Sequence, residues 1–158
     1  MKTLGLIILA GSVIFFGVFS SYKTKRILFL IKNILNFMYY TKTQIECFNT
    51  PLDAIYKKYA EKNECEIREL IENISKNGWA SSLETNCNHL PDSIRDLLLE
   101  YGENLGKTNK QEQLKHSIHY TQMLEEKYKE MVLTTPDKIK LSIALSIYSG
   151  LMLIILFI

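Results

Sequence analysis

Three side chains that could bind a metal lie close together in residues 112–119. Glu112, His116 and His119 are spaced i, i+4 and i+7, so a helix would place them on one face, and both residue types are ordinary zinc ligands. Cys87 and His89 are the nearest candidates for completing the ligand set. An exposed polar helix face accounts for the same residues, and we therefore expect no metal site.

Residues 102–108, with the sequence GENLGKT, resemble a phosphate-binding loop. That loop requires four residues between its glycines and follows a strand, whereas Gly102 and Gly106 are separated by three residues and a predicted helix precedes them. No Ser/His/Asp or Cys/His arrangement has supporting context either. We expect no catalytic residue, no cofactor and no enzymatic activity; a nucleotide-binding enzyme is the alternative that this near-match leaves open.

The cysteines and the charges exclude further classes. Cys47, Cys65 and Cys87 are odd in number and lack C-x-x-C spacing, which favours free thiols in a reducing cytosol over a disulfide framework or a zinc ribbon. Of the 19 Lys and Arg residues, all but Lys2 lie between positions 23 and 140, together with all 17 Asp and Glu. A nearly balanced domain offers no basic stripe for phosphates, so we expect no nucleic acid binding.

Two uncharged stretches bracket this charged region. Residues 4–22 and 141–158 contain no charged side chain, and at 1.5 Å rise per residue each would span about 27 to 28 Å as a helix, close to the hydrocarbon thickness of a bilayer. We predict two membrane-spanning helices. A cleaved signal peptide is the alternative for the first, but residues 23–46 continue as helix-compatible sequence without Gly or Pro.

The basic residues beside these stretches predict the orientation. Lys23, Lys25, Arg26 and Lys32 follow the first stretch and Lys138 and Lys140 precede the second, whereas Lys2 alone lies on the other side. Since positive charge marks the cytoplasmic side, the central domain is predicted to be cytoplasmic. The predicted organisation is a membrane helix over residues 1–22, a helical bundle over 23–135 and a second membrane helix over 136–158.

Small residues recur every fourth position in the second stretch. Ser142, Ser146 and Gly150 would share one helix face, a pattern that lets two membrane helices approach closely. A partner helix or an oligomer is therefore expected at this face.

Helical signals fill the central domain, and no strand signal appears. Thr50 is expected to cap a helix that begins at Pro51 and ends near Asn63. Gly78 is expected to end the next helix in the left-handed conformation, with Trp79 in the core. A helix after Pro91 should end at Gly106, and the following one, capped by Thr108 or Asn109, should end at Thr135 and Pro136. Short connections indicate an all-α, antiparallel bundle.

A specific resemblance appears in residues 99–116, LEYGENLGKTNKQEQLKH. A helix that ends in Leu105-Gly106, a short capped turn and then Gln113 in a long helix resembles the stage III sporulation protein AB family. The Thr50-Pro51-Leu52 segment, Trp79 and the closing residues 145–150 agree with it, so the resemblance covers essentially the whole chain. Asn109 replaces the family's usual Asp, which leaves any role for a carboxylate there in doubt.

The resemblance implies a protein of endospore-forming bacteria, similar to the cytoplasmic module of inner-membrane platform proteins in type II secretion and type IV pilus systems. It implies a channel complex between mother cell and forespore, a location in the mother-cell membrane around the forespore, and partners that include a secretion-type ATPase of the same operon, other channel subunits and membrane lipid. Leu105, Gly106, Asn109 and Gln113 become the candidate contact residues. A platform for an unrelated secretion or pilus system and a secreted, anchored helical domain are the alternatives.

Overall fold

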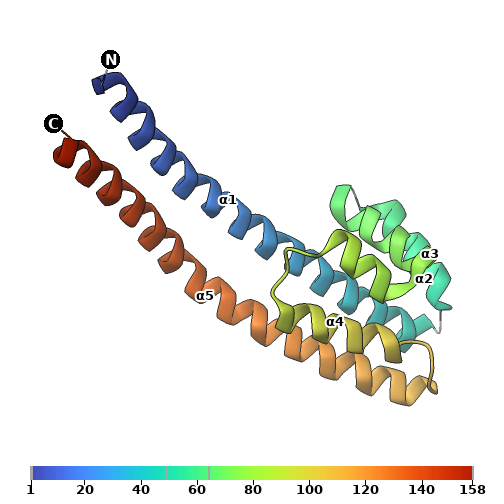
Figure 1. Ribbon diagram of the computed structural model, residues 1–158. Helices are drawn as coiled ribbons and strands as arrows, with labels where there is room; N and C mark the ends of the chain where they lie inside the picture. Colours follow the sequence, from blue (N-terminus) through green and yellow to red (C-terminus); the bar gives the residue numbers. More distant parts are fainter. Residues whose placement is uncertain (1, 49, 64, 158) are drawn as a thin grey trace. The chain divides into compact units, whose positions relative to one another are not determined.

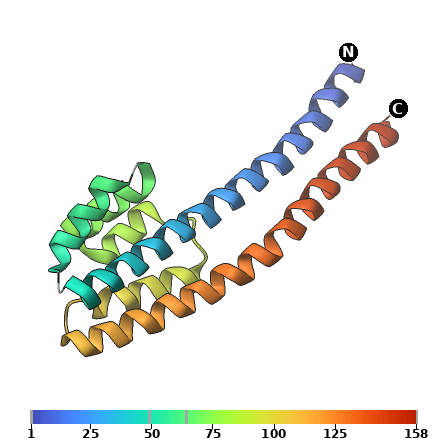
Figure 2. The ribbon, with the colours of Figure 1, turned by 180° about the vertical axis from the view of Figure 1, so that it is seen from behind.

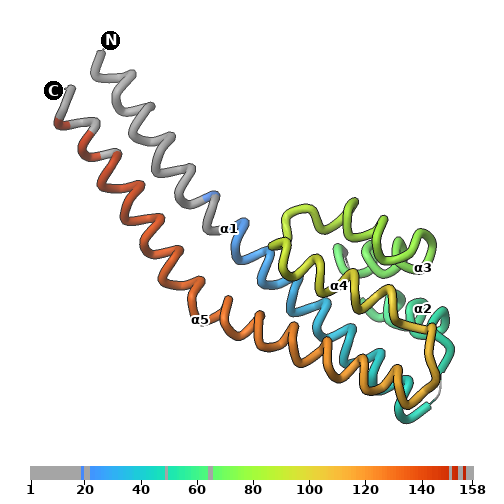
Figure 3. Tube along the Cα trace, turned by 60° about the horizontal axis from the view of Figure 1, so that its bottom comes forward, coloured from blue at the N-terminus to red at the C-terminus, as the bar shows by residue number. Residues whose placement is uncertain are grey.

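The computed structural model describes the backbone of residues 2–48, 50–63 and 65–157. Within these ranges it describes all side chains except those of residues 2–18, 20, 21, 65, 150, 153, 154, 156 and 157. Figure 3 draws the residues of uncertain placement in grey.

Every regular element in the described ranges is helical, which confirms the all-α prediction (Figure 1). The elements are α1 (Lys2–Thr43), a π-helical turn (Gln44–Phe48), α2 (Leu52–Lys62), α3 (Cys65–Asn86), α4 (Asp92–Asn104) and α5 (Lys110–Phe157). The chain divides into two compact units. We call Phe29–Lys129 the bundle unit, and Met1–Leu28 together with Glu130–Ile158 the end unit.

Aromatic rings join the helices of the bundle unit. The ring of Phe37 in α1 lies 5.0 Å from Tyr59 and 5.8 Å from Tyr56, both in α2, and 6.2 Å from Trp79 in α3. Trp79 in turn meets Tyr101 of α4 edge-on, at 5.4 Å between ring centroids. All five side chains are at most 9% exposed. Edge-to-face packing of this kind adds to the free energy gained by burying the rings, so one cluster connects four helices.

Trp79 occupies the space that a side chain at position 102 would need. A Cβ atom built on Gly102 would lie 2.1 Å from Trp79 Cγ, far inside van der Waals contact. The indole is 8% exposed and its Nε1 donates a hydrogen bond to the Tyr56 hydroxyl at 3.3 Å. Gly102 is therefore required where α4 passes the indole, and the prediction that Trp79 lies in the core is confirmed.

Gly78 interrupts α3 directly before this tryptophan. Its φ of 80° confirms the expected positive φ, but its ψ of 172° does not belong to the left-handed helical conformation that we predicted. An extended backbone at positive φ is accessible essentially to glycine alone. The chain consequently changes direction at Gly78 and continues as helix to Asn86, instead of ending there.

Four buried hydroxyl groups lie on α1, α4 and α5 within the bundle unit. Thr41, Tyr101, Ser117 and Thr121 are at most 2% exposed, and their hydroxyls have no aligned hydrogen-bond partner among the described residues. Burial raises the pKa of Tyr101, while the neighbouring hydroxyls of Ser117 and Thr41 lower it. We call these four residues the hydroxyl cluster.

Exposed polar contacts join the same helices at the surface. The Tyr39 hydroxyl donates to Glu125 Oε2 at 2.5 Å, and this bond to a carboxylate raises the pKa of Tyr39 to about 12. Lys129 Nζ lies 2.7 Å from the other oxygen of Glu125, and together with Tyr39 it lowers the pKa of that carboxyl group. The Tyr120 hydroxyl of α5 donates to Glu100 of α4 at 3.1 Å. Figures 1 and 2 show α4 antiparallel to the first part of α5.

The predicted helix boundary at Thr135 and Pro136 is wrong, because α5 continues through Pro136 to Phe157. Proline removes the N–H that would bond to the carbonyl of Val132, and its ring crowds the same carbonyl, at a cost of about 3 kcal/mol in a helix interior. The remaining hydrogen bonds of a 48-residue helix continue on both sides. A single proline is thus insufficient to end this helix.

Within the described residues, no helix carries a stretch that is both long and apolar enough to cross a bilayer. Residues 4–18, 20 and 21 of the first predicted span, and 150, 153, 154 and 156–158 of the second, lie outside the residues whose side chains are described.

We predict that Gly102→Ala destabilises the bundle by about 1 to 3 kcal/mol, because the added methyl group displaces the indole of Trp79. In a Trp79→Ala background part of this penalty should disappear, since two of the three clashing atoms, Cγ and Cδ1, are gone while Cβ stays, and alanine favours a helix interior over glycine. Urea unfolding of the detergent-solubilised chain, followed by circular dichroism, measures both values. Exposed Glu103→Ala is the control, and an equal penalty in both backgrounds would refute the contact.

Candidate functional site

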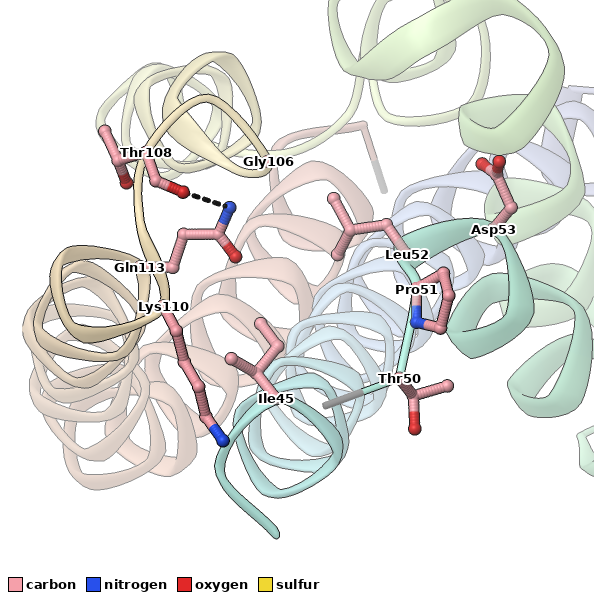
Figure 4. Close-up of a pocket in the computed structure, with 9 residues that line it drawn as sticks. All are labelled: Ile45, Thr50, Pro51, Leu52, Asp53, Gly106, Thr108, Lys110 and Gln113. Atoms are coloured by element: carbon pink, nitrogen blue, oxygen red, sulfur yellow. Dashed lines mark hydrogen bonds between the residues drawn. The ribbon is translucent and has the colours of Figure 1, made fainter. Parts of the chain in front are cut away.

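A groove of ≈ 500 Å³ lies where the start of α2 meets the turn between α4 and α5 (Figure 4). It belongs entirely to the bundle unit. The lining residues come from three separate segments of the chain, and they are Ile45, Thr50, Pro51, Leu52, Asp53, Gly106, Thr108, Lys110 and Gln113. Two of the candidate contact residues, Gly106 and Gln113, are among them. We call this feature the turn groove.

Leu105 and Gly106 end α4 beside the turn groove, and of the two Gly106 lines it. Leu105 is 9% exposed, and its N–H donates to the carbonyl of Tyr101 at 3.2 Å. Gly106 has a φ of 86°, a conformation that side chains disfavour. A Cβ atom at Gly106 would also lie 2.7 Å from Leu52 Cδ1. The turn and the first residue of α2 are therefore in close contact, and the prediction that α4 ends at Gly106 is confirmed.

The side chains of Asn109 and Gln113 make hydrogen bonds to the backbone where the turn joins α5. Asn109 Oδ1 accepts a hydrogen bond from the N–H of Glu112 at 3.0 Å, which is the capping bond predicted for this residue. Gln113 Nε2 donates to the carbonyl of Thr108 at 3.0 Å, as Figure 4 shows. Both candidate contact residues thus have a structural role in shaping the groove.

The α2 side of the turn groove differs from the prediction at Thr50. The Thr50 hydroxyl donates to Gln44 Oε1 at 3.3 Å and does not cap α2. Pro51, with φ −59° and ψ 145°, occupies the position before the helix, and its carbonyl accepts the N–H of Ile55 at 3.1 Å. The helix begins at Leu52, one residue later than expected, and the Thr50 hydroxyl bonds instead to the π-helical turn.

Of the side chains that the structure describes, two charged ones line the turn groove, Asp53 and Lys110, and both are exposed. Leu52 and Ile45 supply its apolar surface, and backbone and hydroxyl groups supply its polar surface. The lining holds no nucleophile paired with a base, so the arrangement suits binding of a polypeptide segment better than a reaction. Sequence analysis missed Ile45 and Asp53, because only the fold brings them to the turn.

The residues considered for a metal site do not form one. Among the described residues no group of three His, Cys, Asp or Glu side chains is close enough to hold a metal ion. The His116 ring lies against Tyr120 at 4.4 Å, and burial, with a smaller effect of His119, lowers the pKa of His116. Cys87 is buried, which raises its pKa to about 11 and makes it a poor ligand.

The segment that resembles a phosphate-binding loop is not a loop throughout. Gly102 belongs to α4 and contacts Trp79, so the first part of the segment is helical. A phosphate cradle requires successive free backbone N–H groups at this point. The geometry gives no support to nucleotide binding here.

The small residues of the second uncharged stretch lie in α5, in the end unit. Ser146 Oγ donates to the carbonyl of Ser142 at 2.9 Å, and Ser149 Oγ donates to the carbonyl of Ser146 at 3.1 Å. These hydroxyls therefore bond to carbonyl groups of their own helix, and these short side chains protrude little from the surface of α5. Gly150 lies outside the residues whose side chains are described, and packing of this face against a partner helix stays a prediction.

A family model described as stage III sporulation protein AB matches residues 2–158. No curated protein matches the chain, and no solved structure does.

We predict that Asn109→Ala destabilises the bundle by about 1 kcal/mol through loss of the cap of α5. Asn109→Asp should be neutral or stabilising, because a carboxylate keeps the acceptor and adds a negative charge at a helix N-terminus. Unfolding by urea at neutral pH compares the two variants with Lys107→Ala, an exposed control in the same turn. Equal destabilisation by Asp and by Ala would show that the cap does not stabilise the helix.

Proposed function

The chain belongs to the stage III sporulation protein AB family, and we propose that it acts as a membrane platform of the channel between mother cell and forespore. The family makes it a sporulation-related protein. In this proposal the bundle unit docks a secretion-type ATPase and links it to channel subunits in the bilayer. The role is mechanical and requires no reaction at the protein itself.

The turn groove is the observation that carries this proposal. The segment most specific to the family forms one wall, and the Thr50-Pro51-Leu52 segment, which also agrees with the family, forms the other. The groove is open at the surface, with exposed Pro51, Asp53, Thr108 and Lys110. Loops held by a rigid scaffold are where binding residues concentrate. A surface shaped by the family's own turn is accordingly the best candidate for its partner.

Apolar side chains at the surface of α5 support attachment to a membrane. Five large apolar side chains of α5 are each at least 60% exposed: Leu141, Leu145, Tyr148, Met152 and Ile155. Exposing large apolar side chains to water costs about 25 cal/mol for each Å², and lipid removes that cost. The uncharged residues 4–22 at the other end and the basic residues beside both stretches support two anchors with the bundle unit in the cytoplasm.

Docking at the turn groove is tested with the full chain in nanodiscs and the purified ATPase of the same operon. Lys110→Glu reverses one of the two charges in the groove, and we expect it to weaken binding at least tenfold in biolayer interferometry. The substitution places a carboxylate in the first turn of α5, which favours the helix, so a loss of binding would not come from unfolding.

Lys115→Glu is the matched control, because it makes the same charge change at an exposed position of α5 outside the groove. The control should bind like the parent chain. Equal losses in both variants, or no binding by the parent chain, would contradict docking at this groove.

Topology is tested by cysteine labelling in a bacterial host that expresses the full chain. In a variant with Cys65→Ser and Cys87→Ala, exposed Cys47 should react with a membrane-impermeant maleimide only after the cells are permeabilised. In the parent chain Cys87 should stay unmodified until the protein unfolds, because it is buried and its pKa is about 11. Labelling of Cys47 in intact cells would contradict the cytoplasmic placement and favour the secreted, anchored alternative.

A further inference from the structure

We propose that the end unit binds the headgroup of an anionic phospholipid in a pocket between its two helical segments; this inference rests on the membrane attachment proposed above. The pocket has a volume of ≈ 390 Å³ and lies between residues 25–28 of α1 and 132–140 of α5. We call it the collar pocket. It is separate from the turn groove, with which it shares no residue.

The lining of the collar pocket combines apolar surface with positive charge. Its apolar surface comes from Leu28, Val132, Pro136 and Ile139, and its charged residues, among those described, are Lys25 and Lys140. Neither Glu130 nor Asp137, the acidic residues of the adjoining α5 segment, lines it. A site with ammonium groups and no carboxylate has the charge of an anion site, and its apolar walls exclude a fully hydrated ion as the best occupant.

The position of the collar pocket along the chain corresponds to the headgroup layer. Lys25 is three residues beyond the end of the uncharged residues 4–22, and Lys140 directly precedes the uncharged residues 141–158. At 1.5 Å per residue both Cα atoms lie within about 5 Å of the ends of these stretches, whereas each polar layer of a bilayer is about 5 to 7 Å thick. Both lysines are thus at the depth of lipid phosphates when residues 4–22 and 141–158 span the hydrocarbon.

The chemistry of an anionic phospholipid matches this combination. Its phosphodiester accepts charge-assisted hydrogen bonds from ammonium groups, and its glycerol and upper acyl carbons pack on Leu28, Val132 and Ile139. Leu133 and Leu141, the chain neighbours of the lining residues Val132 and Lys140, are 76% and 62% exposed. Inorganic phosphate would satisfy the lysines alone and leave the apolar walls in contact with water.

The test uses the full chain in nanodiscs, made with phosphatidylcholine alone or with phosphatidylglycerol added. Native mass spectrometry then identifies the lipids that remain bound to the protein after it is released from the nanodisc. The parent chain should retain phosphatidylglycerol at least fivefold over phosphatidylcholine. Lys25→Gln with Lys140→Gln should abolish this preference. Lys23→Gln with Lys138→Gln removes the same charge from neighbouring residues outside the pocket and should preserve it.

Equal loss in both double variants would overturn the inference, because it would reduce the effect to general surface charge. Displacement of the lipid by millimolar inorganic phosphate would also overturn it. Extraction with alkaline carbonate separates this inference from the proposed function: a chain that resists extraction but shows no preference for phosphatidylglycerol refutes the collar pocket alone. A chain that carbonate releases refutes the membrane attachment and the collar pocket together.

Discussion

The contact between the Trp79 indole and the backbone at Gly102 determines how the bundle unit packs. Because position 102 has no side chain, α4 approaches the indole closely, and the indole reaches Phe37, Tyr56 and Tyr101 from one place. Gly78 supplies the preceding change of direction through its positive φ. Two glycines far apart in the sequence are thus required for one tryptophan, and through it for the relative placement of α1 to α4.

Much of the fold was predictable from the sequence, because helix periodicity, capping residues and glycine stops act locally. The ends of α4, the Asn109 cap and the buried Trp79 follow from such signals. The turn groove did not follow from them, since contact between Leu52 and Gly106 is a property of the tertiary structure. Pro136 shows the opposite failure: a strong local signal was outweighed by the hydrogen bonds of the long helix around it.

The small net charge of the chain conceals two differently charged surfaces. The turn groove carries one acid and one base, Asp53 and Lys110, whereas the collar pocket carries two bases, Lys25 and Lys140, and no acid. The first combination suits a protein surface of mixed charge and the second suits a lipid phosphate. The net charge of +2 is the reason that we expect no nucleic acid binding, but it carries no information on either surface.

The hydroxyl cluster fixes the longitudinal register of α5. Ser117 and Thr121 are one turn apart and buried, next along the helix to Gln113 on one side and Glu125 on the other. Sliding α5 by a turn would bring the long amide or the carboxylate into the space of a small hydroxyl, where neither side chain fits and a charge would lose its water. Purely apolar helix faces tolerate such sliding far better, so a few poorly paired hydroxyls align the longest helix of the protein at some cost in stability.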